Sequence, residues 1–398
     1  MKEGWEYKKL GEIATEMYRG SGIKRDQVTK EGTPCVRYGE IYTTYNISFD
    51  TCASHTKIEN VTSPKYFEYG DLLFAITGES VEDIGKTIAY LGDEKCLCGG
   101  DIICMKHHQN PKYLAYALST PDAIRQKGIG KTKLKVVHTN APALKAINIP
   151  LAPLSEQQSI VDYLDSAFAK IDAMKANAEK ALNEAKALFQ ASLKEMLEPK
   201  EGWEEKSVGE IAEIKGGKRL PKGEKLQLEP TLHKYIRVAD FNDYGTVDLS
   251  DIRYISDKVY EQIKRYIINK EDIYISIAGT IGKSGIIPEE LDGSNLTENA
   301  CRLILSKEIN QKFMYYMTIS PDFIRQEIES TKISAQPKLA LTRLADIIVS
   351  YPSFVEQQHI ADTLDTLKSK VDRLQENYDK ISQECDALKQ AILRQIFE

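Results

Sequence analysis

The chain repeats itself with a period of about 200 residues, and this repeat limits its fold more than any other feature. The opening "GWEYKKLGEIA" (residues 4–14) returns as "GWEEKSVGEIA" (residues 202–212). Further matches keep the same register, namely "GDLLFAITG" with "EDIYISIAG", "STPDAIRQ" with "ISPDFIRQ", and "EQQSIVDYLD" with "EQQHIADTLD". The sequence therefore predicts two copies of one module, related by an internal pseudo-twofold repeat.

Each half has a globular part followed by one long helix. The first 150 residues or so of each half contain short apolar runs separated by turn residues, which is typical of a mixed α/β domain. Helical segments are expected to break before Pro121 and Pro321. Residues 155–197 and 354–397 contain neither Gly nor Pro, and a helix of that length spans about 65 Å. We expect Ser155, or the residue before it, to cap the first long helix, and Ser353 to be the nearest substitute in the second.

Apolar residues in both long helices alternate by four and three, which is the pattern of a coiled-coil seam. The predicted pairing residues are Leu164, Ile171, Ala178, Ala181, Ala185, Leu188, Leu364, Leu367, Val371, Leu374, Ile381 and Leu388. Small residues meet large ones if the helices run antiparallel, because Ala178 then faces about Leu374, Ala181 about Val371, and Ala185 about Leu367. The alternative is two separate amphipathic helices, each packed on its own domain.

These patterns predict an α+β protein in which two mixed α/β domains are separated by two long helices that form an antiparallel coiled coil. The predicted limits are 1–152 and 200–352 for the globular domains, 153–199 for the central helix and 353–398 for the C-terminal helix.

Three Gly-Lys-[Ser/Thr] sequences suggest a phosphate-binding loop, but their spacing excludes it. Such a loop needs a Gly five residues before the Gly of Gly-Lys, so that backbone N–H groups surround the phosphates. Ser80, Arg125 and Ile277 occupy that position instead. Residues 85–87 and 282–284 are interpreted as two versions of one polar loop that follows the same apolar strand.

Other chemistry is also unsupported. Zinc could in principle use the cysteines and histidines of "CLCGGDIICMKHH", which are Cys96, Cys98, Cys104, His107 and His108. However, Cys98, Ile102 and Cys104 alternate as buried strand residues would, and free Cys is often buried. No hydrolase, metalloprotease, nuclease, methyltransferase or dinucleotide-binding motif occurs. The chain is predicted to have no catalytic residues, no metal and no cofactor.

Composition favours a cytoplasmic protein. The seven cysteines are an odd number without a disulfide-like framework, there is no run of 18 apolar residues, and the first ten residues have no apolar signal core. The net charge of −6 argues weakly against nucleic acid, yet residues 123–155 contain no acidic residue and six Lys or Arg. Binding depends on where the charges lie.

Basic residues recur at matching places in the two halves, in "MYRGSGIKR" and "IKGGKRLPKG" and again near the end of each globular part. Flexible cations beside glycines suit phosphate contacts, and Arg37 and Arg237, in equivalent positions, could read guanine. The candidate DNA-binding residues are Arg19, Lys24, Arg25, Arg37, Lys86, Lys131, Lys133, Lys135, Lys215, Lys218, Arg219, Lys222, Arg237, Lys283, Lys332, Lys338 and Arg343. Any one of them alone would be interpreted as a solvated surface charge, and only their repetition supports the group.

The whole chain resembles the specificity subunit of type I restriction-modification systems. The resemblance rests on "PLSEQQSIVDYLD" leading into a long helix, its degenerate copy "PSFVEQQHIADTLD" at equal spacing, and the repeated "GWE" openings. It implies two target recognition domains, each reading one half of a split double-stranded DNA site, and antiparallel helices that set the distance between the half-sites. It also implies methyltransferase subunits with S-adenosylmethionine and ATP-driven restriction subunits as partners, with the catalysis in those partners.

Two points limit the resemblance. The second copy reads "SYPSFVEQQ" where the first reads "IPLAPLSEQQ", and base-reading residues cannot be carried over by motif because the globular parts share little beyond framework. The alternative function is a structural coiled-coil adaptor that binds no nucleic acid.

Overall fold

The structure is a computed structural model that describes residues 4–81, 83–130, 136–331 and 338–398. The chain divides into two units, of which unit 1 comprises Met1–Ala178 with Asp379–Glu398 and unit 2 comprises Glu179–Tyr378. Each unit contains one repeated globular part and a segment of each long helix. The repeat in the sequence is therefore also a repeat in the fold.

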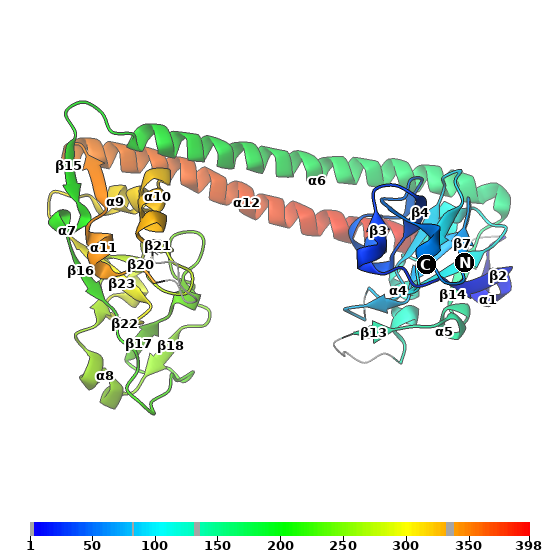
Figure 1. Cartoon of the computed structure of the whole chain (residues 1–398), viewed down its shortest axis with the longest axis horizontal. Helices are drawn as coiled ribbons and strands as arrows, with labels where there is room; N and C mark the ends of the chain where they lie inside the picture. The colour runs from blue at the N-terminus through cyan, green and yellow to red at the C-terminus, as the bar shows by residue number, and fades with distance from the viewer. Residues whose placement is uncertain (1–3, 82, 131–135, 332–337) are drawn as a thin grey trace. The chain divides into compact units, whose positions relative to one another are not determined.

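Unit 1 has two five-stranded sheets (Figure 1). The order in the first is β2 (Glu16–Arg19), β12 (Ile102–Lys106), β8 (Leu72–Ala75), β10 (Thr87–Tyr90) and β5 (Ser48–Phe49). The order in the second is β3 (Val28–Thr29), β6 (Ser54–Thr56), β4 (Thr33–Val36), β11 (Cys96–Cys98) and β7 (Tyr66–Phe67). Two short pairs are β1 (Glu6–Lys9) with β14 (Asn148–Leu151) and β9 (Thr77–Gly78) with β13 (Val137–His138). The helices are α1 (Leu10–Ile13), α2 (Tyr38–Thr43), α3 (Pro111–Ala117), α4 (Pro121–Gly128) and α5 (Ala141–Lys145).

Unit 2 repeats this topology with four-stranded sheets. The first has the order β16 (Ala212–Gly216), β23 (Ala300–Leu305), β20 (Ile273–Ser276) and β21 (Ser284–Ile286), and the second β18 (Arg253–Ile255), β17 (His233–Ile236), β22 (Ser294–Leu296) and β19 (Ile267–Ile268). Unit 2 also contains the pair β15 (Glu204–Ser207) with β24 (Ile348–Tyr351) and the α-helices α7 (Val208–Ile211), α8 (Asp257–Ile263), α9 (Gln311–Thr318), α10 (Pro321–Ser330) and α11 (Leu341–Ala345). In both units one pair in the second sheet is parallel, β4 with β11 and β17 with β22.

The central strand β8 is apolar throughout because both of its faces are covered. Leu72 and Phe74 point into the core on the helical side, while Leu73 and Ala75 point into the core shared with the second sheet. Successive side chains of a strand alternate between faces, so a strand buried on both sides reads as a continuous apolar run. Strand β20 of unit 2 alternates in the same way between two cores.

The predicted helix breaks and buried strand cysteines are confirmed. Helix α4 begins at Pro121 and α10 at Pro321, each after a break from the preceding helix. Cys98 and Cys104 are completely buried in β11 and β12. All seven cysteines are free and buried.

The two long helices are α6 (Leu154–Leu197) and α12 (Phe354–Phe397), with 44 residues each. The predicted Ser155 cap is wrong, because α6 already begins at Leu154 and the Glu156 N–H donates to the Pro153 carbonyl (2.8 Å). The predicted substitute in the second copy is confirmed, since the Ser353 hydroxyl accepts from the Glu356 N–H (3.4 Å).

The long helices pack together antiparallel within each unit, as predicted. In unit 1, Lys389 of α12 forms an ion pair with Asp172 of α6. In unit 2, Lys186 of α6 donates to Gln375 of α12 (2.7 Å). The expected facing pairs are wrong, because Lys186 meets Gln375 and Ala185 therefore lies level with Glu376 rather than with Leu367. The predicted register was chosen from side-chain size alone. That criterion takes no account of how each helix docks on its globular part.

The apolar seam also differs from the prediction at alternate positions of α6. Ala181 and Leu188 are exposed, Leu188 by 60%, while their neighbours Leu182 and Phe189 are buried. Leu388 of α12 is 48% exposed. Where two apolar residues are adjacent, periodicity cannot choose between them, and the aromatic ring buries more area. Of the other predicted seam residues, Leu164, Ile171 and Leu364 are buried, and half-buried are Ala178, Ala185, Leu367, Val371, Leu374 and Ile381.

The Glu-Gln-Gln sequences at the start of the long helices dock each helix on its globular part. Gln157 is completely buried and its side-chain oxygen accepts from the Asn110 N–H (2.9 Å). Gln357 is equally buried and accepts from the Asn310 N–H (2.8 Å). The repeated motif is therefore explained by a repeated backbone contact.

A second docking contact lies two helical turns further along. Asp165 accepts from the Tyr116 hydroxyl (2.7 Å), and Asp365 accepts from the Tyr316 hydroxyl (2.6 Å). Burial and the adjacent carboxylate raise the pKa of both tyrosines, so the hydroxyls remain protonated donors.

Candidate nucleic-acid interface

The ends of three strands bring the chain after β2 close to residues 136–140 of unit 1. After β2, the Gly20 N–H donates to the Ile102 carbonyl (2.9 Å). After β8, the Ile76 N–H donates to the Asp101 carbonyl (3.0 Å), and the Ile76 carbonyl accepts from the Thr139 N–H (2.9 Å). The chain that follows β2 and the chain that follows α4 therefore meet at one edge of the first sheet. We call this the strand-end surface of unit 1, formed by residues 19–25, 76–78, 99–101 and 136–140.

Unit 2 contains the same arrangement. The Gly217 N–H donates to the Ala300 carbonyl (2.9 Å), and the Ile277 N–H donates to the Asn299 carbonyl (2.8 Å). The Ile277 carbonyl accepts from the Leu339 N–H (3.0 Å). The strand-end surface of unit 2 is formed by residues 216–222, 277–279, 297–299 and 338–340.

One glycine in each unit makes this surface possible. A Cβ at Gly20 would lie 2.1 Å from the Gly99 carbonyl oxygen, and a Cβ at Gly217 would lie 2.0 Å from the Thr297 carbonyl oxygen. No side chain fits at either position, because the obstacle is backbone. The glycines of "YRG" and "KGG" are thus required by a close approach of two chain segments.

An exposed arginine is held by a carboxylate on each strand-end surface. Arg19 donates to Asp101 (2.6 Å), with 64% of its side chain exposed. Arg219 donates to Glu298 (2.6 Å), with 79% of its side chain exposed. A guanidinium has five N–H donors in a planar fork, so an acid at one side orients the fork while its other side faces solvent. Both arginines were predicted, whereas Asp101 and Glu298 were not, because acidic residues are not expected beside a polyanion.

Lys86 and Lys283 lie in equivalent loops. The Gly85 N–H donates to Ala75 and the Gly282 N–H to Ser276 (2.9 Å each), which confirms that the Gly-Lys sequences are two versions of one loop. The Lys86 ammonium donates to the Tyr45 carbonyl (3.0 Å), and burial lowers its pKa. Lys283 donates to the Phe241 carbonyl (3.1 Å) and pairs with Asp243 (2.8 Å). Both lysines therefore already hold the chain of their own unit.

The equivalence of Arg37 and Arg237 is also confirmed. The carbonyl just before Arg37 accepts from the Gly99 N–H (2.9 Å), and that before Arg237 accepts from the Thr297 N–H (3.0 Å). The Arg237 guanidinium pairs with Asp240 and Asp251, whose hydrogen bonds raise its pKa further. A guanine contact from Arg237 would have to replace these ion pairs.

The other predicted cations differ in their exposure and in their contacts. Lys24, Arg25 and Lys222 are exposed, and Lys215 pairs with Glu213 (2.9 Å). The Lys218 ammonium lies 5.3 Å from the centre of the Tyr266 ring.

Two further predicted positions lie near the end of the second globular part, and four fall outside the described residues. Lys338 is exposed and forms a β-bridge with Ala278. Arg343 is half-buried and donates to the Ser330 carbonyl (2.7 Å). The positions outside the described residues are Lys131, Lys133, Lys135 and Lys332.

His138 was missed from sequence and lies on the strand-end surface of unit 1. Its Nδ1 is 3.1 Å from the Thr77 hydroxyl, across the β9–β13 pair, and both side chains are at the surface. Its position directly after the basic run, in a segment without acids, was the signal that could have indicated it.

Within the described ranges, no group of three or more His, Cys, Asp or Glu side chains is placed to hold a metal ion. Among the helices of those ranges, none combines the length and apolarity that a bilayer crossing requires.

Comparisons with known proteins agree with the duplicated fold. The family model "Type I restriction modification DNA specificity domain" matches residues 2–184 and 200–383, so both copies match separately. The specificity subunit of the type I restriction enzyme EcoBI from Escherichia coli is 27% identical over 72% of this chain, and the match covers 65% of that relative, just under two thirds of its length. A putative MjaX specificity subunit from Methanocaldococcus jannaschii is 26% identical over 93% of this chain and 88% of its own.

Solved structures share the fold at low sequence identity. A chain from a type I R-M system, described with complex assembly and conformational transition, matches with a TM-score of 0.78 and 17% identity, covering 99% of this chain and 97% of its own. The HsdS subunit from Thermoanaerobacter tengcongensis matches with a TM-score of 0.56 and 16% identity, covering 100% and 97%.

Proposed function

This chain belongs to the type I restriction-modification DNA specificity (HsdS) family, and from that premise we propose that unit 1 and unit 2 each read one half of a bipartite double-stranded DNA site. The specificity subunit of such a complex is itself non-catalytic, and its role is to select the DNA.

The observation that carries the proposal is the duplicated strand-end surface. Each copy presents an exposed arginine oriented by a carboxylate, beside a glycine that admits close backbone approach. An oriented guanidinium suits bidentate contact with a guanine edge or a phosphate. Loops at strand ends can vary without disturbing the sheet behind them, so two copies of one scaffold can read different sequences.

The paired helices are proposed to set the spacer between the half-sites. Both are long and free of Gly and Pro, and each is docked by a buried glutamine on its own globular part. Helix length then fixes how many base pairs separate the two readers, since DNA advances about 3.4 Å per base pair.

The proposed partners are methyltransferase subunits that supply S-adenosylmethionine chemistry and ATP-dependent restriction subunits, in a cytoplasmic complex. The free, buried state of all seven cysteines supports a reducing compartment. The alternative of a coiled-coil adaptor without DNA binding predicts no steep loss of DNA affinity with added salt, whereas phosphate contacts predict one.

The test compares arginine variants of the two units in the assembled methyltransferase complex. Arg19→Ala should lower affinity for one half-site only, and Arg219→Ala for the other, each by about 1–3 kcal/mol if a base contact is lost. Measurement of affinity against duplexes mutated in either half, at several salt concentrations, separates base contacts from phosphate contacts.

The chain offers a matched control pair. Arg125 and Arg325 are exposed, lie in the corresponding helices α4 and α10, and pair with the acid three residues earlier. Their Ala variants should leave both half-sites unchanged. If Arg19→Ala weakened both half-sites equally, separate reading by the two units would be wrong.

A further inference from the structure

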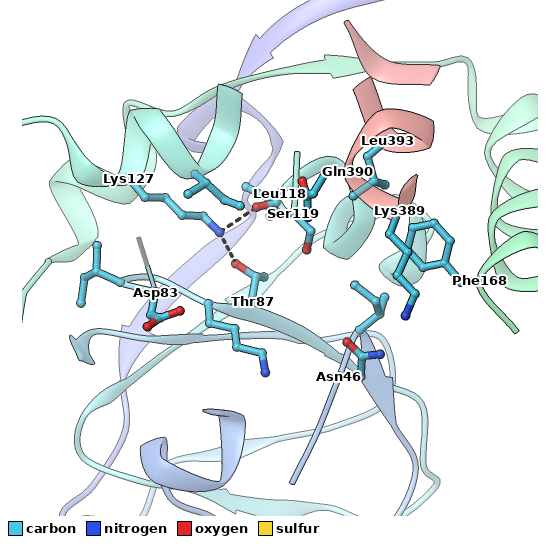
Figure 2. A pocket seen from close by; sticks show the side chains of 14 residues that line it. Asn46, Asp83, Thr87, Leu118, Ser119, Lys127, Phe168, Lys389, Gln390 and Leu393 are labelled. Atoms are coloured by element: carbon cyan, nitrogen blue, oxygen red, sulfur yellow. Dashed lines mark hydrogen bonds between the residues drawn. The ribbon is translucent and has the colours of Figure 1, made fainter. Parts of the chain in front are cut away.

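Unit 1 contains a cavity of about 240 Å³ between its first sheet, α4 and the C-terminal part of α12. Three lysines line it, Lys86, Lys127 and Lys389, against one acid among the described lining residues, Asp83. Figure 2 shows these elements around the cavity, with Lys127 on one side and Lys389 beside Phe168 on the other. Lysines that converge on one half-open pocket need a reason, because a buried charge is costly unless it is paired.

Lys127 is the decisive group. It is 6% exposed, and its ammonium donates to the Leu118 carbonyl (2.8 Å) and the Thr87 hydroxyl (3.1 Å), both of which are neutral (Figure 2). An ammonium has three N–H donors, and the described residues provide these two acceptors. Burial lowers the pKa of Lys127 to about 7.

The two other lysines are held at the cavity by a backbone carbonyl in one case and by an ion pair in the other. Lys86 is fixed by the Tyr45 carbonyl (3.0 Å), a neutral group. Lys389 pairs with Asp172, which lies outside the lining, and its ammonium is 5.3 Å from the centre of the Phe168 ring. Lys86 and Thr87 belong to the Gly-Lys-Thr sequence whose spacing excludes a backbone phosphate loop, so any anion here would be bound by side chains.

We propose that this cavity is a binding site for a small oxyanion of the phosphate class, with Lys127 as its principal ligand and Lys86, Lys389 and Thr87 around it. The anion supplies the negative charge that Lys127 lacks and accepts its third N–H. This site goes beyond the reading of DNA by the strand-end surfaces and does not depend on it.

Unit 2 provides an internal control. The residue equivalent to Lys127 is Glu327, also buried at 5% exposure, with one carboxylate oxygen buried and without a hydrogen-bond partner among the described residues. A carboxylate at this position repels an anion, so the site is specific to unit 1.

The experiment uses the full chain at pH 7 with inorganic phosphate as the probe and chloride at matched ionic strength as reference. Phosphate should raise the melting temperature saturably, by about 2–4 °C at five times its Kd. In protein labelled at the lysine Cε, phosphate should raise the pKa of the Lys127 resonance by one unit or more.

Variants test whether the effect of phosphate on the melting temperature arises at this cavity. Lys127→Met should abolish the phosphate-dependent rise, while Glu327→Gln and the exposed Lys170→Met should retain it. The proposal is overturned if phosphate has no saturable effect beyond chloride, or if Lys127→Met retains the full effect. The resonance titration of the unmodified chain gives this answer even if Lys127→Met fails to fold.

A final arm distinguishes the source of the anion. Duplex DNA is added without phosphate, and then with it. If DNA alone raises the pKa of Lys127 and prevents the phosphate effect, the bound group is a DNA phosphate. If phosphate acts equally with and without DNA, the bound group is a free anion.

Discussion

Lys127 in unit 1 and Glu327 in unit 2 occupy the same place in the two copies and carry opposite charges. Both pack against the glycine of the equivalent loop, since a Cβ at Gly85 would lie 3.1 Å from the Lys127 side chain and a Cβ at Gly282 would lie 2.3 Å from Glu327. Where the long helices dock, by contrast, the two copies share the same buried glutamine with the same backbone partner, as Gln157 and Gln357 show. Helix docking tolerates little change, whereas the interior behind the polar loop accepts even a reversal of charge.

The largest expected effect is on the free energy of unfolding, and it concerns the two phenylalanines of α6 that are buried in the cores of the two units. Tyr116 of unit 1 contacts Phe168 (5.4 Å between ring centres), and the equivalent Tyr316 of unit 2 contacts Phe189 (6.3 Å). Phe168→Ala and Phe189→Ala should each cost about 3–5 kcal/mol in unfolding free energy, because each leaves a cavity. Chemical denaturation measures this.

Leu188→Ala is the matched control for Phe189→Ala. It removes an apolar side chain that is mostly exposed and should change stability by less than about 0.5 kcal/mol. Equal losses of unfolding free energy for Leu188→Ala and Phe189→Ala would support Leu188 as the seam residue expected from the sequence and would contradict the structure.

The docking glutamines should be equally important in both units. Gln157→Ala and Gln357→Ala each leave a part-buried backbone N–H without its acceptor, at a cost of about 1–3 kcal/mol. Their neighbours Gln158 and Gln358 are exposed, so the same change there should cost less than about 1 kcal/mol. A large difference between the costs at Gln157 and Gln357, measured by denaturation, would show that the two docking sites are not equivalent.

The effects expected at the charge-reversed pair depend on pH in opposite directions. Lys127 has its pKa lowered from 10.5 to about 7, so the unfolded state binds more protons between these values and stability rises with pH across that window. Glu327 has its pKa raised from 4.5 to about 7, so the folded state binds more protons there and stability falls as pH rises from 4.5 to 7.

Neutral variants should remove these slopes. Lys127→Met should flatten the rise above pH 7, and Glu327→Gln should flatten the fall below it, each with a gain of about 1–3 kcal/mol at pH 7 in chloride. Melting curves across pH 5–10 provide the measurement, and parallel curves for both variants and the parent chain would refute the charge asymmetry.

The sequence predicts most of the secondary structure that the two halves share, because this part of the sequence is repeated. The repeated "GWE" and "EQQ" stretches, the helix breaks before Pro121 and Pro321 and the two long helices all agree with the structure. The seam was predicted less well, because Leu188 and Phe189 are adjacent and only tertiary packing on Tyr316 decides between them. The Ser155 cap was wrong for a similar reason, since the helix begins one residue earlier than its composition indicates.

The candidate interface was only partly visible from sequence. Basic residues beside glycines indicated Arg19 and Arg219, but the carboxylates that orient them come from residues about 80 positions later. Lys86 and Lys283 have the residue type of phosphate contacts, yet their ammonium groups bind backbone carbonyls, which no local pattern reveals.

The most direct test of two readers held at a fixed separation is sequencing of the methylated sites in cells that express the complex with a lengthened pair of helices. Four residues inserted after Ala178 and four after Tyr378 add about 6 Å, which corresponds to about two base pairs. The account predicts unchanged half-sites with a longer spacer between them. Altered half-site bases with the original spacer would contradict it.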